Sequence, residues 1–277
     1  MRVKPERRRA IAFRGLRPSG FTILELAITL AVMAMLATAV LVPLVAQIEQ
    51  RKIAATEKIL EQAAEALMGY AAATGRFPCP AVDTGVNPTG VEAFATTPTA
   101  GTVANGICAT FVGFLPAVTL GFTPVDAQGY AIDAWATRQN RIRYAVSNQT
   151  VPVASTNTNP FTRTDGMRTA TAGAMAATPL LYVCGSGTGV VAGANCGTAV
   201  TLTSNAPAVI WSVGANAATG GTSTDELQNP NPNGGSADRI FVSKIRTDIE
   251  GAAFDDIVTW LSVGNLISRM VMAGQLP

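Results

Sequence analysis

The sequence contains no histidine among its 277 residues. Histidine is the commonest general base and metal ligand, and it activates most serine and cysteine nucleophiles. Its absence therefore excludes most hydrolase mechanisms. Apolar residues are plentiful, at 48% of the chain, so we expect one globular domain with a sizeable core and an appendage.

Basic residues are concentrated at the N-terminus. Residues 1–20 contain one acid, Glu6, and seven of the 20 basic residues: Arg2, Lys4, Arg7, Arg8, Arg9, Arg14 and Arg17. The rest of the chain has 13 basic and 17 acidic residues, a formal charge of −4. The basic pI is thus a property of the first 20 residues, which argues against a nucleic-acid partner.

Directly after this basic stretch, residues 26–46 form an apolar run of 21 residues without a charge. As a helix, this run would extend about 30 Å, the thickness of the hydrocarbon core of a bilayer. It predicts a membrane span. The preceding bases predict a cytoplasmic N-terminus, with the chain from residue 47 onward on the other side of the membrane.

Residues 19–36, SGFTILELAITLAVMAML, follow the basic leader. This stretch resembles the cleavage and methylation signature of type IV prepilins and type II secretion pseudopilins. The resemblance implies that a prepilin peptidase cuts after Gly20, on the cytoplasmic side, and methylates Phe21. It implies further partners: other pilin or pseudopilin subunits, an inner-membrane assembly platform and membrane lipid. It implies no cofactor, metal or catalytic residue.

Glu25 is the only charged residue near the start of the apolar run. A carboxylate in hydrocarbon costs a few kcal/mol and needs a partner or a functional reason. The resemblance supplies a partner, the N-terminal amine of a neighbouring subunit in a filament. The alternative is that Glu25 extends to the membrane edge beside Phe21 while the chain is in lipid. Further along, Pro43 predicts a kink or local melting of the helix.

The helical pattern continues beyond the run and becomes amphipathic, with apolar residues such as Leu60, Ala63 and Leu67 on one face. Gly75 and Pro78 predict its end. We therefore divide the chain into a leader (residues 1–20), a long helix (21–74) whose first half spans the membrane, and a globular domain outside the cytoplasm (75–277).

The globular domain is predicted to contain short strands at residues 141–146, 180–184, 208–213 and 240–242, each bounded by Gly, Pro, Asn or Asp. Residues 257–261 fit a strand or a helix, and residues 266–272 fit a short helix. Strands that follow one long helix predict an α+β fold, with the helix lying across an antiparallel sheet, as in pilins.

The four cysteines lie outside the apolar run. In an exported domain they would form disulfides, and four cysteines allow three connectivities. We favour Cys79 with Cys108 and Cys184 with Cys196, because each pair closes a short loop rich in Gly, Thr or Ala. The alternative is that these cysteines are buried or free thiols.

Two polar stretches, residues 151–178 and 216–238, predict surface loops, since their composition buries little apolar area. They could also carry an adhesive or partner-contacting surface. Residues 133–135, Asp-Ala-Trp, are similar to an Asp-x-Trp-Gly turn of the major pseudopilins, although Ala136 stands where glycine is usual.

The acids Asp248, Glu250, Asp255 and Asp256 lie close together in the sequence, but they lack the alternating spacing of a calcium loop. A solvated acidic edge is the simpler interpretation, and we expect no metal site.

We therefore predict a structural subunit, a minor pilin or pseudopilin, because the chain is long for a major subunit. Pilus and secretion pseudopilus stay open. One alternative is a membrane-anchored periplasmic enzyme, whose nucleophile and base a histidine-free sequence does not show. Another is a pilus-tip adhesin or DNA-uptake subunit, for which Arg138, Arg141 and Arg143 form a small basic cluster.

Overall fold

The computed structural model describes residues 20–83, 89–95, 108–153, 156–219, 221, 223–229, 239–249 and 251–276, without the side chains of residues 38–43, 153 and 156–158. The predicted leader, apart from Gly20, lies outside the described residues. Glu250 and the side chain of Pro43 also lie outside them.

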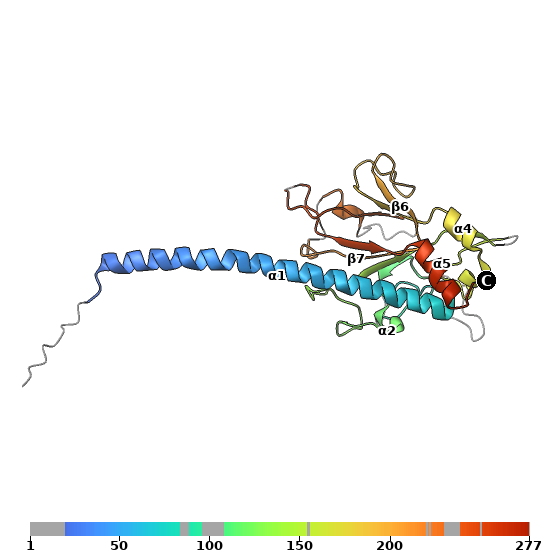
Figure 1. The fold of residues 1–277 in the computed structure, drawn as a ribbon, viewed down its shortest axis with the longest axis horizontal. Coiled ribbons are helices and arrows are strands. Elements are labelled where there is room, and N and C mark those ends of the chain that lie inside the picture. Colours follow the sequence, from blue (N-terminus) through green and yellow to red (C-terminus); the bar gives the residue numbers. More distant parts are fainter. Residues whose placement is uncertain are drawn as a thin grey trace, which may run out of the picture. The chain divides into compact units, whose positions relative to one another are not determined.

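The first element is the long helix α1 (Ile23–Thr74), which confirms the predicted helix to within two residues at its start (Figure 1). It is continuous through residue 43, so the predicted local melting does not occur. It ends where expected: Gly75 has a φ of 72°, and its N–H donates to the carbonyl of Ala71 at 2.8 Å. A left-handed glycine just past the last turn is a common helix stop.

The chain divides into two compact units, residues 1–49 and 50–277. The second unit begins 25 residues before the domain boundary predicted at residue 75, because the second half of α1 supplies part of its core. Leu60, Ala63 and Leu67 are at most 1% exposed. These are the apolar positions that the sequence placed on one helix face.

The main sheet of the second unit has four antiparallel strands in the order β1, β2, β7, β9. Their bounds are β1 (Val112–Phe114), β2 (Arg143–Val146), β7 (Ala208–Ser212) and β9 (Ile257–Trp260). Strands β2, β7 and β9 lie within predicted segments, and residues 257–260 prove to be a strand rather than a helix.

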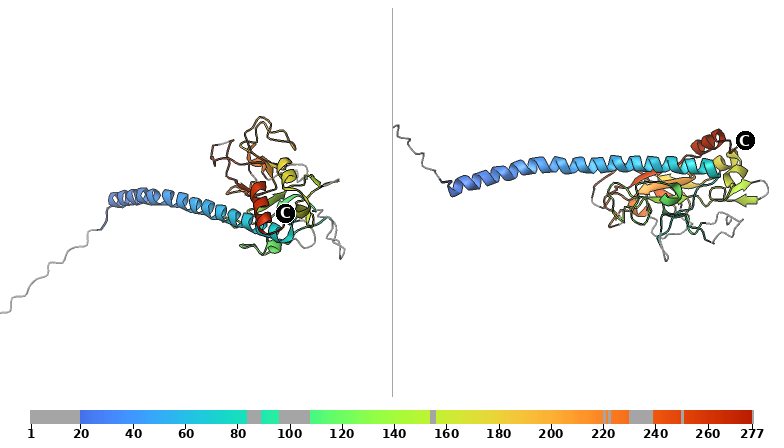
Figure 2. Two further views of the ribbon diagram at one scale, coloured as in Figure 1. Left: turned by 45° about the vertical axis from the view of Figure 1, so that its right-hand side comes forward. Right: turned by 90° about the horizontal axis from the view of Figure 1, so that it is seen from below.

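Both faces of this sheet are apolar. Tyr144 and Ile210 point into a core shared with α1 and with helix α5 (Val263–Met272), which contains the predicted short helix. Ala145 and Trp211, their neighbours along the strands, point into a second core. Figure 2 shows the strands along the second half of α1, with α5 near the C-terminal end of that helix. Every residue of β7 is buried, because the strand is covered on both sides.

The second core lies between the main sheet and a three-stranded sheet in the order β6, β5, β8. Its strands are β5 (Leu181–Cys184), β6 (Thr201–Ala206) and β8 (Ile240–Val242). Strand β5 pairs antiparallel with β6 but parallel with β8. The expected antiparallel sheet is therefore correct for the main sheet, whereas two of the predicted strands belong to this mixed sheet.

The stretch 151–178, expected to be a surface loop, is largely ordered. It contains the hairpin β3 (Val151–Val153) and β4 (Thr156–Thr158) and the short helices α3 (Gly166–Thr169) and α4 (Ala172–Ala177). Phe161, Met167 and Met175 within it are fully buried. These three large side chains anchor a stretch whose average composition is polar. Two more short helices complete the described fold, α2 (Ala117–Leu120) and the 3₁₀ helix η1 (Glu226–Gln228).

Candidate assembly and processing site

The predicted cleavage junction lies immediately before the helix. Gly20 and Phe21 are non-helical and exposed, and α1 begins two residues later at Ile23. The side chain of Phe21 is 76% exposed. The backbone at Gly20 is therefore accessible in the described chain, as a peptidase substrate would need to be.

Thr22 caps the helix and places Glu25 in its first turn. The hydroxyl oxygen of Thr22 accepts a hydrogen bond from the backbone N–H of Glu25 at 3.2 Å, and its carbonyl accepts from the N–H of Leu26 at 3.0 Å. Thr-x-x-Glu is the capping-box pattern, and an acid in the first turn is favoured by the helix dipole. The sequence analysis missed this local role of Glu25, although the Thr22 to Glu25 spacing signals it.

The first unit presents an apolar surface that is exposed among the described residues. All described side chains from Phe21 to residue 37 are exposed, including Ile23 at 90%, Leu24 at 71% and Met35 at 73%. An apolar surface of this extent marks a site of interaction with another molecule or with lipid.

Residues 26–46 were predicted to span a membrane. Of the helices in the described part of the chain, none combines the length and the hydropathy needed to cross one.

The predicted disulfides are both confirmed. Cys79 is bonded to Cys108 and Cys184 to Cys196, with Cα atoms 5.3 Å and 5.6 Å apart. All four cysteines are buried. Disulfides persist in oxidising compartments, so the second unit belongs outside the cytoplasm.

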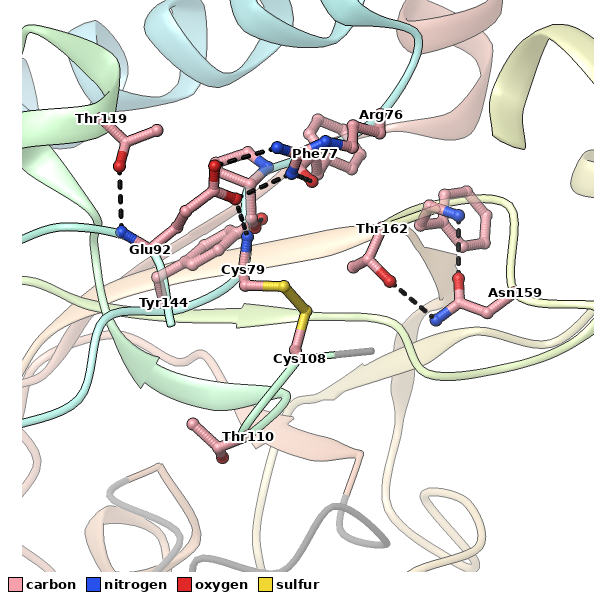
Figure 3. Close-up of a disulfide and its surroundings, with 12 residues drawn as sticks. Arg76, Phe77, Cys79, Glu92, Cys108, Thr110, Thr119, Tyr144, Asn159 and Thr162 are labelled. Carbon is pink, nitrogen blue, oxygen red and sulfur yellow. Dashed lines mark hydrogen bonds and ion pairs between the residues drawn. A yellow bond between two sulfur atoms is a disulfide. The ribbon is translucent and has the colours of Figure 1, made fainter. Parts of the chain in front are cut away.

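The first disulfide stands beside an ion pair that fastens the end of α1 to the domain (Figure 3). Arg76 donates two hydrogen bonds to the carboxylate of Glu92, at 2.8 Å and 2.9 Å. The same carboxylate accepts from the backbone N–H of Cys79 at 3.1 Å and from the hydroxyl of Tyr70 at 3.3 Å. Burial alone would lower the pKa of Arg76, but the hydrogen bonds and charge of Glu92 raise it. Glu92 thereby connects the end of α1 to the segment that contains Cys79.

The Asp-Ala-Trp phrase forms the expected turn. One oxygen of Asp133 accepts from the N–H of Trp135 at 2.8 Å, and the other accepts from Asn140 and Ser212 at 3.0 Å and 2.5 Å. Burial raises the pKa of Asp133 despite these hydrogen bonds. Ala136 has a φ of 56°, in the left-handed region that glycine enters without strain. Ala136, which stands where the similar Asp-x-Trp-Gly turn has glycine, thus adopts a backbone conformation that glycine favours.

Asp255 and Asp256, expected on a solvated acidic edge, are instead 9% and 8% exposed. Asp255 accepts from the N–H groups of Ala215 and Asn216 at 2.7 Å and 3.0 Å, and Asp256 accepts from the amide of Asn229 at 2.7 Å. Burial raises the pKa of Asp255 and raises that of Asp256 to about 8. These contacts connect the residues just before β9 to the segment that follows β7. Asn216 and Asn229 of that segment lie in the stretch 216–238, which was expected to be a surface loop.

Other candidate residues are dispersed. Asp248 is exposed and lies 3.5 Å from Arg246, and no group of three or more Cys, Asp or Glu side chains in the described chain is arranged to hold a metal ion. Arg141 is 1% exposed and donates to Asp126 at 2.7 Å, whereas Arg138 is exposed. Arg138 and Arg141 therefore do not share one solvated basic surface, because Arg141 is buried and paired with Asp126.

Two half-open hollows lie near β9. One, of about 270 Å³, is lined by Asp255, Asp256, Glu57 and Lys244 among others. Both aspartates there already hold loop segments in place. Comparison of the chain with protein-family models, with curated proteins and with solved structures gives no match.

Proposed function

We propose that this chain is a structural subunit of a type IV pilus or a type II secretion pseudopilus, a minor pilin or pseudopilin. A prepilin peptidase would cut it between Gly20 and Phe21 and methylate Phe21. The single observation that carries the proposal is the exposed apolar half of α1 that begins directly after that junction. The processing signature at residues 19–36 and the disulfide-bonded α+β unit support it.

Before assembly, residues 26–46 would lie in the inner membrane, with the leader in the cytoplasm and the second unit in the periplasm. The motivation is the 21-residue run without a charge. A helix already satisfies its backbone hydrogen bonds, so leaving lipid for a filament gains little from the backbone. Packing between helices and specific polar pairs must supply the preference.

Glu25 would supply the polar pair. After cleavage, the amine of Phe21 is a positive charge, and a carboxylate four residues on is positioned for the amine of a neighbouring subunit. The pair would be strong in an apolar filament core, where an unpaired charge is costly. The capping contact at Thr22 is compatible with this role, because it uses the backbone N–H of Glu25 rather than its carboxylate.

Variants at the helix start separate the two roles of Glu25. Glu25→Gln keeps the backbone N–H that Thr22 caps but removes the charge, and we expect its yield in sheared filaments to fall at least about tenfold, the equivalent of about 1.4 kcal/mol. Thr22→Ala removes the cap and keeps the charge, and its yield should stay within about fivefold of the unaltered chain, since a cap contributes about 1 kcal/mol.

Glu49→Gln serves as the matched control on the same helix. Immunoblots for leader removal and for filament yield read out both steps. Unchanged filament yield for Glu25→Gln would contradict the assembly role of its charge.

A further inference from the structure

The strand edges of the second unit are protected unequally. Beyond β1, Ala81 exchanges two backbone hydrogen bonds with Phe114, at 2.8 Å and 2.9 Å. Beyond β8, the side-chain amide of Asn229 donates to the carbonyl of Val242 at 2.9 Å and accepts from its N–H at 2.7 Å. Strand β6 has Thr, Ser or Asn at four of its six positions. Covered edges and polar edges both discourage pairing with other chains.

Strand β9 has neither protection. It ends the main sheet, its sequence IVTW has no charge, and all four residues are half-exposed. The N–H of Leu261 donates to the carbonyl of Ala208, so Leu261 and alternate residues before it direct their backbone groups toward β7. The backbone groups of Val258 and Trp260 consequently point away from the sheet. Within the described chain, no strand pairs with that edge.

The space beside this edge is unfilled. A hollow of about 380 Å³ lies at the end of β9, walled by Met68 of α1, Trp260 and Leu261 among others. The hollow of about 270 Å³ lies at its start, walled by Ile53 of α1, Ile257 and Val258 among others. Both hollows have α1 on one side; the smaller has β9 on the other, and the larger has the end of β9 and helix α5. A fifth strand would therefore meet a backbone ladder along its edge. On the side of α1 it would meet apolar and acidic residues: Ile53, Ala64, Met68, Glu57 and Glu65.

The charge at the start of β9 favours a basic residue. Glu57, Asp255 and Asp256 line the smaller hollow with Lys244 and Arg246. Lys244 is paired with Asp225 and Arg246 with Asp248, so both bases have acidic neighbours of their own. Burial raises the pKa of Asp256 to about 8, so the acidic excess at this end comes from Glu57 and Asp255.

We propose that the free edge of β9 binds an extended segment of a partner protein, with apolar side chains toward α1 and a basic side chain at the start of β9. This is strand addition to a sheet edge, in which the backbone supplies affinity and the hollows supply specificity. A two-fold pairing of β9 with β9 of a second copy would set the second halves of the two α1 helices antiparallel. In the proposed filament the N-terminal helices are parallel, so this two-fold pairing would not fit. The choice of a partner protein over a second copy therefore rests on the proposed function.

The test uses the full chain in detergent micelles and the fluorescein-labelled peptide acetyl-TVSITVSK-amide. Its Val, Ile and Lys side chains lie on one face of the strand, and its basic end reaches the start of β9 when it pairs antiparallel. We expect saturable binding in fluorescence anisotropy. A peptide of the same sequence with N-methyl groups on the amides that face β9 should lose binding at least about tenfold, because each backbone hydrogen bond contributes about 1 kcal/mol. The same peptide with glutamate in place of lysine should bind about threefold to tenfold more weakly.

Val258→Pro removes the outward N–H and leaves the ladder to β7 intact, since proline is tolerated where a strand N–H faces solvent. We expect about fivefold weaker binding of the unmethylated peptide, the effect of one hydrogen bond. The matched control Val258→Thr keeps the N–H and a β-branched side chain, and should bind normally. Circular dichroism checks the fold of each variant, and if Val258→Pro does not fold, the N-methyl comparison on the unaltered chain decides.

Equal binding of the methylated and unmethylated peptides, or no saturable binding of either, would overturn the proposal. So would a dimer of the full chain, seen by light scattering, that Val258→Pro abolishes, because the occupant would then be a second copy. None of these results bears on the mature N-terminus, so failure here is distinguishable from failure of the proposed processing.

Discussion

The two halves of α1 differ in what covers them, although they belong to one continuous helix. In the first half, Leu30 is 62% exposed and Met33 70%; in the second half, Leu60 and Leu67 are at most 1% exposed. The second half is amphipathic and has a sheet on its apolar face. The first half is apolar, and its described side chains are exposed. The difference indicates that the first half is suited to contact with another molecule or with lipid.

The largest expected effect on stability comes from a variant that loosens the second half of α1 from its sheet. Glu92→Ala should lower the free energy of unfolding by about 3–5 kcal/mol, because it leaves Arg76 buried without its partner. Urea unfolding of the full chain in detergent, followed by tryptophan fluorescence, measures the change. Glu61→Ala, at an exposed position of the same helix, is the control, and its effect should stay within about 0.5 kcal/mol. Equal effects of the two variants would show that the ion pair does not hold the helix end.

A matched leucine pair sharpens the contrast. Leu67→Ala should cost about 3 kcal/mol in the same unfolding assay, through lost burial and a cavity in the core. Leu30→Ala should change the free energy of unfolding by less than about 0.5 kcal/mol, because its side chain is exposed in the isolated chain. Its effect should appear instead in the yield of sheared filaments. A stability loss at Leu30 as large as that at Leu67 would mean that the first half is covered within the chain.

The buried carboxyl groups give the stability of the second unit a pH dependence. In the folded chain the pKa of Asp256 is about 8, while an unfolded aspartate has a pKa of about 4. The folded state therefore holds the proton more tightly, and stability should fall as pH rises from about 4 to about 8 and level off above that. The raised pKa values of Asp133 and Asp255 act in the same direction.

Urea unfolding at pH 6 and pH 9 checks the sign, and no histidine titrates between these values. Asp256→Asn should reduce the loss of stability between the two pH values. An unchanged loss in this variant would assign the dependence to other groups.

The smallest expected effect concerns the turn at residues 133–136. Ala136→Gly should raise the free energy of unfolding by up to about 1 kcal/mol, because glycine adopts a positive φ without the strain that alanine has there. The gain is limited by the greater entropy of glycine in the unfolded chain. Thermal unfolding compares the two, and a lower melting temperature for Ala136→Gly would contradict a strained turn.

Much of this arrangement could be predicted from the sequence, where local patterns are strong. The period of Leu60, Ala63 and Leu67 and the stop at Gly75 predicted the second half of α1. Short apolar segments between turn residues located β2, β5, β7 and β8, while residues 257–261 were left open as strand or helix. The disulfide pairs followed from loop length. The helix and strand signals are local and lie within a few residues of the features that they predict, whereas the disulfides join cysteines 29 and 12 residues apart.

The rest could not be predicted, because it depends on contacts between distant segments. Strand β6, TLTSNA, has no apolar alternation and exists because β5 pairs with it. Phe161, Met167 and Met175 were hidden in a stretch whose average composition is polar. The burial of Asp255 and Asp256 depends on Ala215, Asn216 and Asn229, some 30 to 40 residues away.

The central claim is that the apolar half of α1 begins a mature subunit at Phe21. Intact-mass and fragment-ion spectrometry of the chain, isolated from the producing cell's membranes and filaments, tests it most directly. The account predicts an N-methylated Phe21, and an uncleaved chain when Gly20 is replaced in Gly20→Val. An N-terminus that retains Met1, or one that lies beyond Ala46, would contradict it.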